Sequence, residues 1–321
     1  MADTSYQPKV YRKQGGDTFV VASGGQILVE PGGSVMSGNP TGASDYFVDG
    51  NVSATGSGSI NDPYLTLAEA IAASNTSIGL TANRWWARRN RIFVMGDQEI
   101  TEDLTVFPEK CDVIGVGFDV EAMPRITGTH IIATKAYGTR FFNVGWMNSD
   151  TDELIKLTTD HMAVEFYGNL FWPNVAGSTH CIRLADDNRA FKMVGCRILE
   201  HAGAIGTGIF AEGIKVEGTG QHDMVIRDNF IRATEGIHVV AATGGYNGEI
   251  LENRIHAVAL TINELSDLWY VTNNRLYSDA ADGVAGVGGI VCNTSRAAGN
   301  KFSYAAGSGI NVDYPVVVAI A

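Results

Sequence analysis

Residues 248–257 have the sequence GEILENRIHA, and the chain contains close variants of it on both sides. VIRDNFIRA stands at 225–233 and YVTNNRLYS at 270–278. In each segment a short apolar–polar alternation leads up to an asparagine, and another apolar residue follows two positions later. Alternation with a period of two indicates a short β-strand with one buried face. The recurrence therefore indicates several similar strands.

Six segments share this pattern, at successive spacings of 27, 33, 24, 21 and 26 residues. The repeated position holds Asn169, Cys196, Asn229, Asn253, Asn274 and Asn300. The apolar residue two positions later is Phe171, Ile198, Ile231, Ile255, Leu276 and Phe302. A repeat of about 20–30 residues built on short strands is typical of a parallel β-solenoid, in which each repeat forms one coil and stacks on its neighbours.

The repeated asparagine is expected at a corner of the coil. Asparagine tolerates the left-handed backbone conformation better than most residues do. Stacked asparagine amides can also form a hydrogen-bonded ladder from one coil to the next. Cys196 lacks an amide, so we expect it to interrupt that ladder.

The region before the repeats predicts strands at 91–94, 100–106 and 111–116, and its apolar spacing predicts a helix over 65–73. Such a helix would cover the open end of the solenoid, which otherwise exposes apolar core and unpaired strand edges.

The succession YFVDG, DPYLTLAEAI, RIFVMGD, ITEDLTV and CDVIGVG resembles the opening of pectate-lyase-like β-helix proteins, which include bacteriophage tailspikes and other virion proteins. The resemblance covers about residues 46–305. It implies an all-β, single-stranded right-handed parallel β-helix with a small capping helix. It does not fix the function, because this fold carries lyases, hydrolases, esterases and non-enzymes.

Three regions are expected. Residues 1–45 contain DTFVVASGGQILVEPGGSVMSG (17–38), short apolar strands separated by Gly-Gly turns. This pattern resembles the N-terminal segments by which phage structural proteins attach to the particle or to sister chains; a flexible leader is the alternative. Residues 46–305 form the β-helix. Residues 306–321 end in an apolar run that we expect to pack on the last coil or on another subunit.

Composition excludes several classes of protein. The net charge of −12 disfavours binding to nucleic acid or to an anionic membrane surface. No apolar run approaches the roughly 18 residues that cross a bilayer, and MADTSYQPKV at the start has no apolar core of a secretory signal. The four cysteines form no CxxC pair and are interpreted as buried free thiols: Cys111, Cys181, Cys196 and Cys292.

The sequence contains no recognisable catalytic or metal-binding motif. The seven histidines show neither HExxH nor another metal-ligand spacing: His130, His161, His180, His201, His222, His238 and His256. We therefore assign no catalytic, cofactor-binding or metal-binding residue and expect no cofactor. GVAGVGG (283–289) is interpreted as a solenoid turn rather than a phosphate-binding loop.

Acidic and aromatic residues leave alternatives open. Asp186–Asp187 matches one of the four motifs of polygalacturonase-like β-helix enzymes and is interpreted as a solvated turn. RWWARRN (84–90) either binds sugars or an acidic partner, or covers the first coil. Four acidic residues are candidates for a shared outer face, although each is more simply a surface charge: Glu200, Glu212, Asp223 and Glu249.

Two functions are favoured by the resemblance and by the missing motifs. The first is a bacteriophage structural protein on the virion surface, a capsid decoration or head-fibre protein that attaches by its N-terminal segment and projects the β-helix for host-surface or glycan adhesion. The second is a tailspike that binds or cleaves bacterial surface polysaccharide, as a glycoside hydrolase or polysaccharide lyase. A secreted pectinolytic enzyme is disfavoured. The resemblance also implies a homotrimer, contact with the major capsid protein or other virion proteins, and synthesis in the host bacterial cytoplasm.

Overall fold

The computed structural model divides the chain into two compact units, 1–42 and 43–321. It describes residues 10–12, 19–21, 43–78, 89–117, 122–174, 177–200, 208–218, 220–240, 247–258, 262–264, 269–278, 290–292, 297–304 and 317–318. In the first unit, β1 (Val10–Arg12) and β2 (Phe19–Val21) form an antiparallel pair. The predicted Gly-Gly turns lie outside the described residues.

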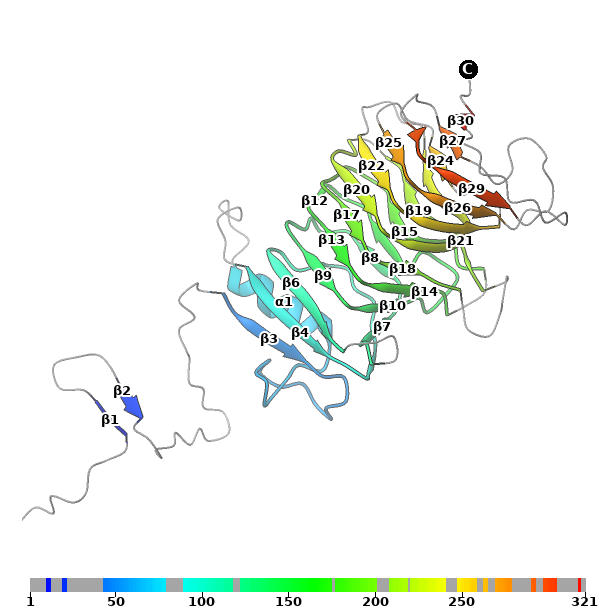
Figure 1. Ribbon diagram of the computed structural model, residues 1–321. Coiled ribbons are helices and arrows are strands. Elements are labelled where there is room, and N and C mark those ends of the chain that lie inside the picture. The colour runs from blue at the N-terminus through cyan, green and yellow to red at the C-terminus, as the bar shows by residue number, and fades with distance from the viewer. Residues whose placement is uncertain are drawn as a thin grey trace, which may run out of the picture. The chain divides into compact units, whose positions relative to one another are not determined.

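Residues 43–321 form three ladders of parallel strands, stacked coil upon coil (Figure 1). Ladder one consists of β3 (Asp45–Val48), β4 (Asn90–Met95), β6 (Cys111–Val116), β9 (Arg140–Phe142), β13 (Glu165–Tyr167), β17 (Lys192–Val194), β20 (Met224–Arg227), β22 (Gly248–Leu251), β25 (Trp269–Thr272) and β28 (Ala297–Ala298).

Along each coil, the strand of ladder one is followed by a strand of ladder two and then by a strand of ladder three. The long strand β21 belongs to both ladders two and three. Ladder two consists of β5 (Glu99–Thr101), β7 (Arg125–Thr127), β10 (Gly145–Met147), β14 (Leu170–Trp172), β18 (Arg197–Ile198), β21 (Phe230–Val239), β23 (Arg254–Ala257), β26 (Arg275–Ser278) and β29 (Lys301–Tyr304). Ladder three consists of β8 (His130–Ile132), β11 (Ile155–Leu157), β15 (His180–Leu184), β19 (Phe210–Val216), the second part of β21, β24 (Ile262–Glu264), β27 (Ile290–Cys292) and β30 (Val317–Val318). The short strands β12 (His161–Met162) and β16 (Asn188–Arg189) pair separately.

The predicted all-β parallel β-helix is confirmed by these pairings. Within ladder two, Ile198 pairs with Ile231 and Ile231 with Ile255, so the apolar residues of successive repeats lie in register. All three side chains are fully buried. The repeated apolar position therefore forms a continuous column through the core.

The predicted asparagine ladder is also confirmed. Asn229 Nδ2 donates to Asn253 Oδ1 at 2.9 Å, Asn253 Nδ2 to Asn274 Oδ1 at 3.0 Å, and Asn274 Nδ2 to Asn300 Oδ1 at 2.9 Å. The same oxygens accept the backbone N–H of the asparagine in the preceding coil. The side-chain ladder stops at Cys196, whose backbone N–H still donates to Asn229 Oδ1.

The left-handed residue of this corner was predicted one position too late. Positive φ angles occur at the residue before each of the six repeated positions: Gly168, Gly195, Asp228, Glu252, Asn273 and Gly299. The repeated asparagine itself is not among the positive-φ residues. The amide of the ladder must point inward to reach the next coil, so the reversal of the chain falls on its exposed neighbour.

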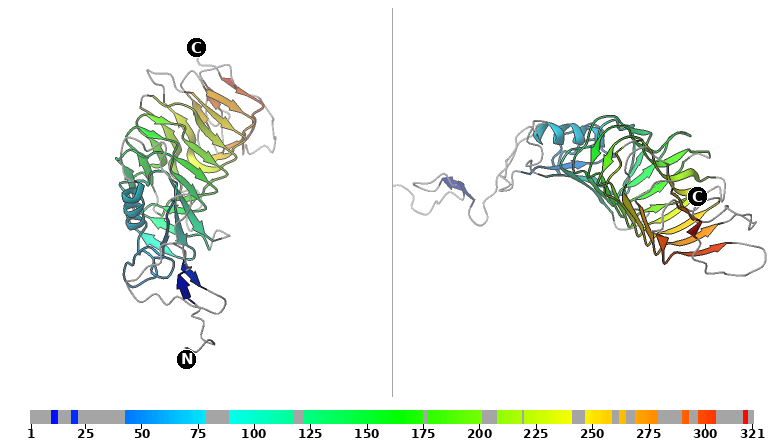
Figure 2. Two further views of the ribbon diagram at one scale, coloured as in Figure 1. Left: turned by 90° about the vertical axis from the view of Figure 1, so that its left-hand side faces the viewer. Right: turned by 90° about the horizontal axis from the view of Figure 1, so that it is seen from above.

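Helix α1 (Leu67–Ile78) packs beside β3 and β4 and contributes Leu67, Ala70 and Ile71 to the core (Figure 2). Thr66 and Glu69 form a capping box, in which Thr66 N–H donates to Glu69 Oε2 at 3.1 Å. The helix continues beyond its predicted end at residue 73. Ser74 and Asn75 are buried there and bond to neighbouring coil residues, which offsets their weak helix propensity.

The strand predicted at 100–106 is shorter, because only Glu99–Thr101 pairs in ladder two. The Glu102 carboxylate instead accepts the N–H groups of Leu67 and Ala68 at the start of α1. Leu104 N–H donates to His130 Nδ1. Because of these tertiary bonds, the backbone after Thr101 does not pair in ladder two.

Three of the predicted thiols, Cys111, Cys181 and Cys196, are free and buried. The C-terminal run contributes β30, which pairs with β27 and extends ladder three. No helix in the described residues is long and apolar enough to span a bilayer.

Candidate functional site

The four acidic candidates do not share one face. Glu212 lies on ladder three, whereas Glu200 follows ladder two and lies 3.5 Å from Arg232. Asp223 and Glu249 line one hollow of ladder one, together with Tyr270. The sequence could not assign faces to these residues, because loops of different length separate them from the strands.

The remaining candidates in the described residues have structural partners. Asp187 binds Arg189 at 2.7 Å in the turn after β15, as expected of a solvated turn. Arg89 of RWWARRN binds Asp112 and the Gly138 carbonyl, each at 2.8 Å. Residues 84–88 and 283–289 lie outside the described part of the chain.

A basic column runs along the outer side of ladder two. In successive coils, Arg197 pairs with Phe230, Phe230 with Arg254, Arg254 with Arg275, and Arg275 with Lys301. These five residues immediately follow the asparagine corner, one in each coil. The strand alternation that buries Ile231, Ile255 and Leu276 turns their neighbours outward. We call Arg197, Phe230, Arg254, Arg275 and Lys301 the basic column.

The four cations of the basic column are exposed, and none forms an ion pair with a described residue. Phe230 is half-buried and supports Arg254, whose Cζ lies 5.7 Å from the centre of the ring. Four unpaired cations in register are unexpected in a chain of net charge −12. Neighbouring like charges repel each other, so the column would gain from an anionic ligand.

Two shallow hollows open beside the basic column. The larger, about 480 Å³, is lined by Phe230, Arg254, Ile255, His256, Arg275, Leu276 and Tyr277. The second, about 300 Å³, extends toward Arg197 and shares Phe230 and Arg254 with the first. Asp228 and Glu252 stand on its rim, and Asp228 lies 3.4 Å from Arg227. The two hollows are therefore adjacent, because Phe230 and Arg254 line both of them.

The ladder-three face has a different electrostatic character, because its charges are paired. Arg183 bridges Glu153 and Glu217 at 2.5 Å each. Glu212 contacts His180 Nε2 and His238 Nδ1 at 2.6 Å each and Lys215 Nζ at 3.2 Å.

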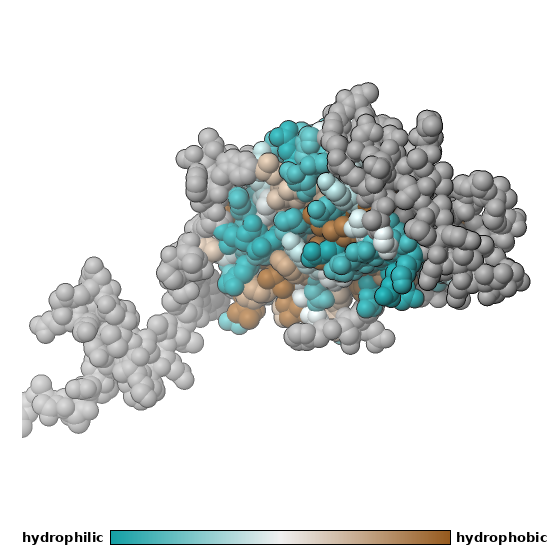
Figure 3. Space-filling view, turned by 45° about the horizontal axis from the view of Figure 1, so that its top comes forward, coloured by the Kyte–Doolittle hydropathy of each residue, from teal (hydrophilic) through white to brown (hydrophobic). Residues whose placement is uncertain are grey.

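Figure 3 shows one face of the molecule, where hydrophilic residues and apolar patches alternate over the described surface.

Burial opposes the ionisation of Glu212, but the contacts with His180, His238 and Lys215 outweigh it and hold the pKa of Glu212 well below its ordinary value. Glu212 is therefore a carboxylate at neutral pH. It cannot serve as a proton donor in that state, whereas a general acid requires a raised pKa.

Sequence reasoning missed the grouping of Glu212, Glu235 and His238, whose ligand atoms lie within 4.8 Å of one another. His238 belongs to this grouping although the sequence shows no metal-ligand spacing around it. Metal-site motifs record neighbours along one chain segment, whereas this grouping joins two coils. The signal that was present is the repeat of EGIK (212–215) as EGIH (235–238).

Two other histidines have structural roles. His130 is fully buried and its Nδ1 accepts the N–H of Leu104. His161 Nδ1 accepts the N–H of Ala136, and its Nε2 lies 3.3 Å from the Ile132 carbonyl. Burial lowers the pKa of each imidazole to about 4, so both are neutral at pH 7.

Neither a family model nor a curated protein matches the chain. Among solved structures, the chain is similar to pectate lyase Pel9A, with 11% identity and a TM-score of 0.44 over 83% of this chain and 76% of that one. A likeness at this level carries neither activity nor substrate to this chain. The parallel β-helix itself rests on the strand pairings.

Proposed function

We propose that this chain is a bacteriophage structural protein on the virion surface, whose β-helix adheres to an anionic glycan of the host surface through the basic column. The observation that carries the adhesive role is the row of exposed cations on ladder two, none of which forms an ion pair with another described residue. The phage origin rests on the sequence resemblance given above.

The chemistry of the basic column suits a repeating anion. A guanidinium group binds a carboxylate or a phosphate through two parallel hydrogen bonds. The coils place one cation after another along ladder two, and Phe230 and Tyr277 add aromatic surface beside them.

The N-terminal unit supports attachment to a partner. A two-stranded pair such as β1–β2 is only marginally stable alone in water. A sister chain or a capsid surface would supply the missing apolar contacts. We propose a homotrimer anchored through residues 1–42 to the capsid. A monomer mass in light scattering of the purified protein would contradict the trimer.

Binding of a polyuronate, with neutral dextran as comparison, tests the adhesive role. The double variant Arg254→Ser/Arg275→Ser should weaken polyuronate binding, and rising salt should weaken it in the wild type. Arg91→Ser/Arg189→Ser is the matched control, because it removes two arginines that are paired with Asp45 and Asp187. Equal binding by both double variants, or equal binding to dextran, would overturn the adhesive role.

A tailspike that cleaves the glycan is the second candidate, favoured by the approach of Glu212 and Glu235 on ladder three. Glycosidases place two carboxyl groups about 5–10 Å apart across the scissile bond. Release of reducing ends or unsaturated sugars from the bound glycan would support cleavage. Loss of that product in Glu235→Gln would place the reaction on ladder three.

A further inference from the structure

A group of potential metal ligands crosses two coils of ladder three. Glu212 of β19 pairs in register with Glu235 of β21, and Lys215 pairs with His238. His180 of β15 pairs with Glu212 from the other side. The repeated EGI segments place the same positions of each coil on the same outer surface.

Two glycines make this arrangement possible. A side chain at i and one at i+3 of a regular strand point to opposite faces, yet Glu235 and His238 both reach Glu212. Gly213 and Gly236 lie between the polar residues of their strands. A Cβ on Gly213 would come within 2.5 Å of the Gly236 carbonyl oxygen, so the two backbones approach more closely than other residues allow.

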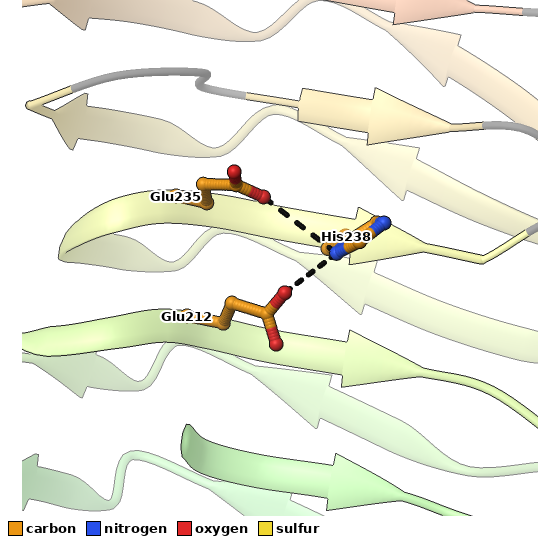
Figure 4. A group of neighbouring side chains, drawn as sticks. All are labelled: Glu212, Glu235 and His238. Atoms are coloured by element: carbon orange, nitrogen blue, oxygen red, sulfur yellow. Dashed lines mark hydrogen bonds and ion pairs between the residues drawn. The ribbon is translucent and has the colours of Figure 1, made fainter. Parts of the chain in front are cut away.

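The side chains of Glu212, Glu235 and His238 point toward one another (Figure 4). His238 Nδ1 lies 2.6 Å from Glu212 Oε1 and 3.6 Å from Glu235 Oε2. His180 Nε2 lies 2.6 Å from the other oxygen, Glu212 Oε2. The two carboxylates and the His238 imidazole therefore meet within the reach of a single ion, whereas His180 contacts Glu212 from the preceding coil.

Several of these atoms lack a hydrogen-bond partner. Glu212 Oε2, Glu235 Oε2 and His180 Nδ1 are buried atoms without one among the described residues. His180 Nε2 lies 2.6 Å from Glu212 Oε2, but the angles of this contact are not those of a hydrogen bond. Glu212 Oε2 has the ion pair with Lys215, whereas a buried Glu235 Oε2 without a hydrogen bond is costly. A cation bound by Glu235 would remove that cost.

Lys215 supplies a cation in the structure. Its Nζ lies 3.2 Å from Glu212 Oε2, 3.5 Å from His180 Nε2 and 3.8 Å from Glu217 Oε2. A metal ion would displace this ammonium group toward Glu217. Lys215 therefore competes with the ion, and its removal should strengthen metal binding.

We propose that Glu212, Glu235 and His238 bind a first-row transition metal ion of the Zn²⁺ class. Imidazole and carboxylate together suit Zn²⁺ in four-coordinate sites, whereas all-oxygen sites suit Ca²⁺ and Mg²⁺. The Glu235 side chain is 29% exposed, which leaves a route for the ion. The ion would fasten consecutive coils, and the site is independent of glycan adhesion.

Calorimetric titration of the chelator-treated full chain with ZnCl₂ tests this site. The wild type should bind one ion per chain. Glu235→Gln should weaken binding about tenfold or more, and Lys215→Ala should strengthen it. Glu249→Gln, on ladder one, is the matched control and should leave binding unchanged.

Two further measurements separate the metal site from a fold defect. The thermal midpoint of metal-free Glu235→Gln should match that of the metal-free wild type. Co²⁺ in place of Zn²⁺ should give the visible absorption of a four-coordinate nitrogen–oxygen site in the wild type, and not in His238→Gln. No saturable binding, or equal binding by wild type and Glu235→Gln, would overturn the proposal and leave adventitious surface binding only.

Discussion

Replacing Asn253 by leucine removes one amide from the middle of the asparagine ladder. Asn253 is fully buried, and its Nδ2 donates to the Ile226 carbonyl and to Asn274 Oδ1. Its Oδ1 accepts from Asn229 N–H and Asn229 Nδ2. Leucine has the same branched arrangement of side-chain heavy atoms but can make none of these four bonds.

The expected loss of stability depends on which buried groups lose their hydrogen-bond partner when Asn253 is replaced. Asn229 Nδ2 retains a bond to Met193, and Asn274 Oδ1 retains the Asn253 N–H. The Asn229 N–H and the Ile226 carbonyl lose their side-chain partner. At about 1–3 kcal/mol each, Asn253→Leu should lower the free energy of unfolding by about 2–6 kcal/mol.

Urea denaturation followed by circular dichroism measures this loss as a lower midpoint at an unchanged slope. Glu249→Ala is the control in the same coil, because this exposed side chain should change stability by no more than about 0.5 kcal/mol. Cys196→Asn is the converse change: it supplies the missing amide and should add about 1 kcal/mol. Equal midpoints for Asn253→Leu and Glu249→Ala would refute the role of the ladder.

The remaining predictions concern the corner residue and acid. Gly195 has φ 64° and open space for 4 Å around the position that a Cβ would take, so Gly195→Ala should cost about 1–2 kcal/mol through backbone strain alone; an unchanged midpoint would contradict a left-handed corner. His130 and His161 have pKa values of about 4 in the folded protein against about 6.5 when unfolded, so the unfolded chain binds more protons below pH 6.5. Stability should therefore fall between pH 6.5 and 4, by about 3 kcal/mol for each histidine. His130→Gln should reduce this slope, and parallel pH curves for variant and wild type would contradict the assignment.

Much of the fold could be predicted because every coil repeats the same order of buried apolar and exposed polar positions. The alternation around Ile231 and Ile255 identifies a buried face, and a solenoid needs that face in every coil. The same repetition predicted that Asn229, Asn253 and Asn274 would stack. Propensity and periodicity were weaker guides where tertiary bonds compete, as at the end of α1 beyond Ser74.

The candidate sites could not be predicted in the same way. Arg254 and Arg275 are 21 residues apart in the sequence, and only the register of β23 with β26 makes them neighbours. Glu212 and His238 meet because the coil brings Glu235 into register with Glu212 after 23 residues, a length that no local motif specifies, and His238 follows three residues later. A repeat alignment that retained the outward positions could have found both groups. Such an alignment compares the outward-facing polar residues of each strand as well as its buried apolar residues.

Immunogold electron microscopy of phage particles, with antibody raised against residues 46–321, tests most directly whether this chain is a virion surface protein. We predict gold on intact particles. Label over the head would identify a decoration or head-fibre protein, and label at the tail tip would identify a tailspike. Particles without gold, from a lysate in which the same antibody detects the free protein, would contradict the virion location.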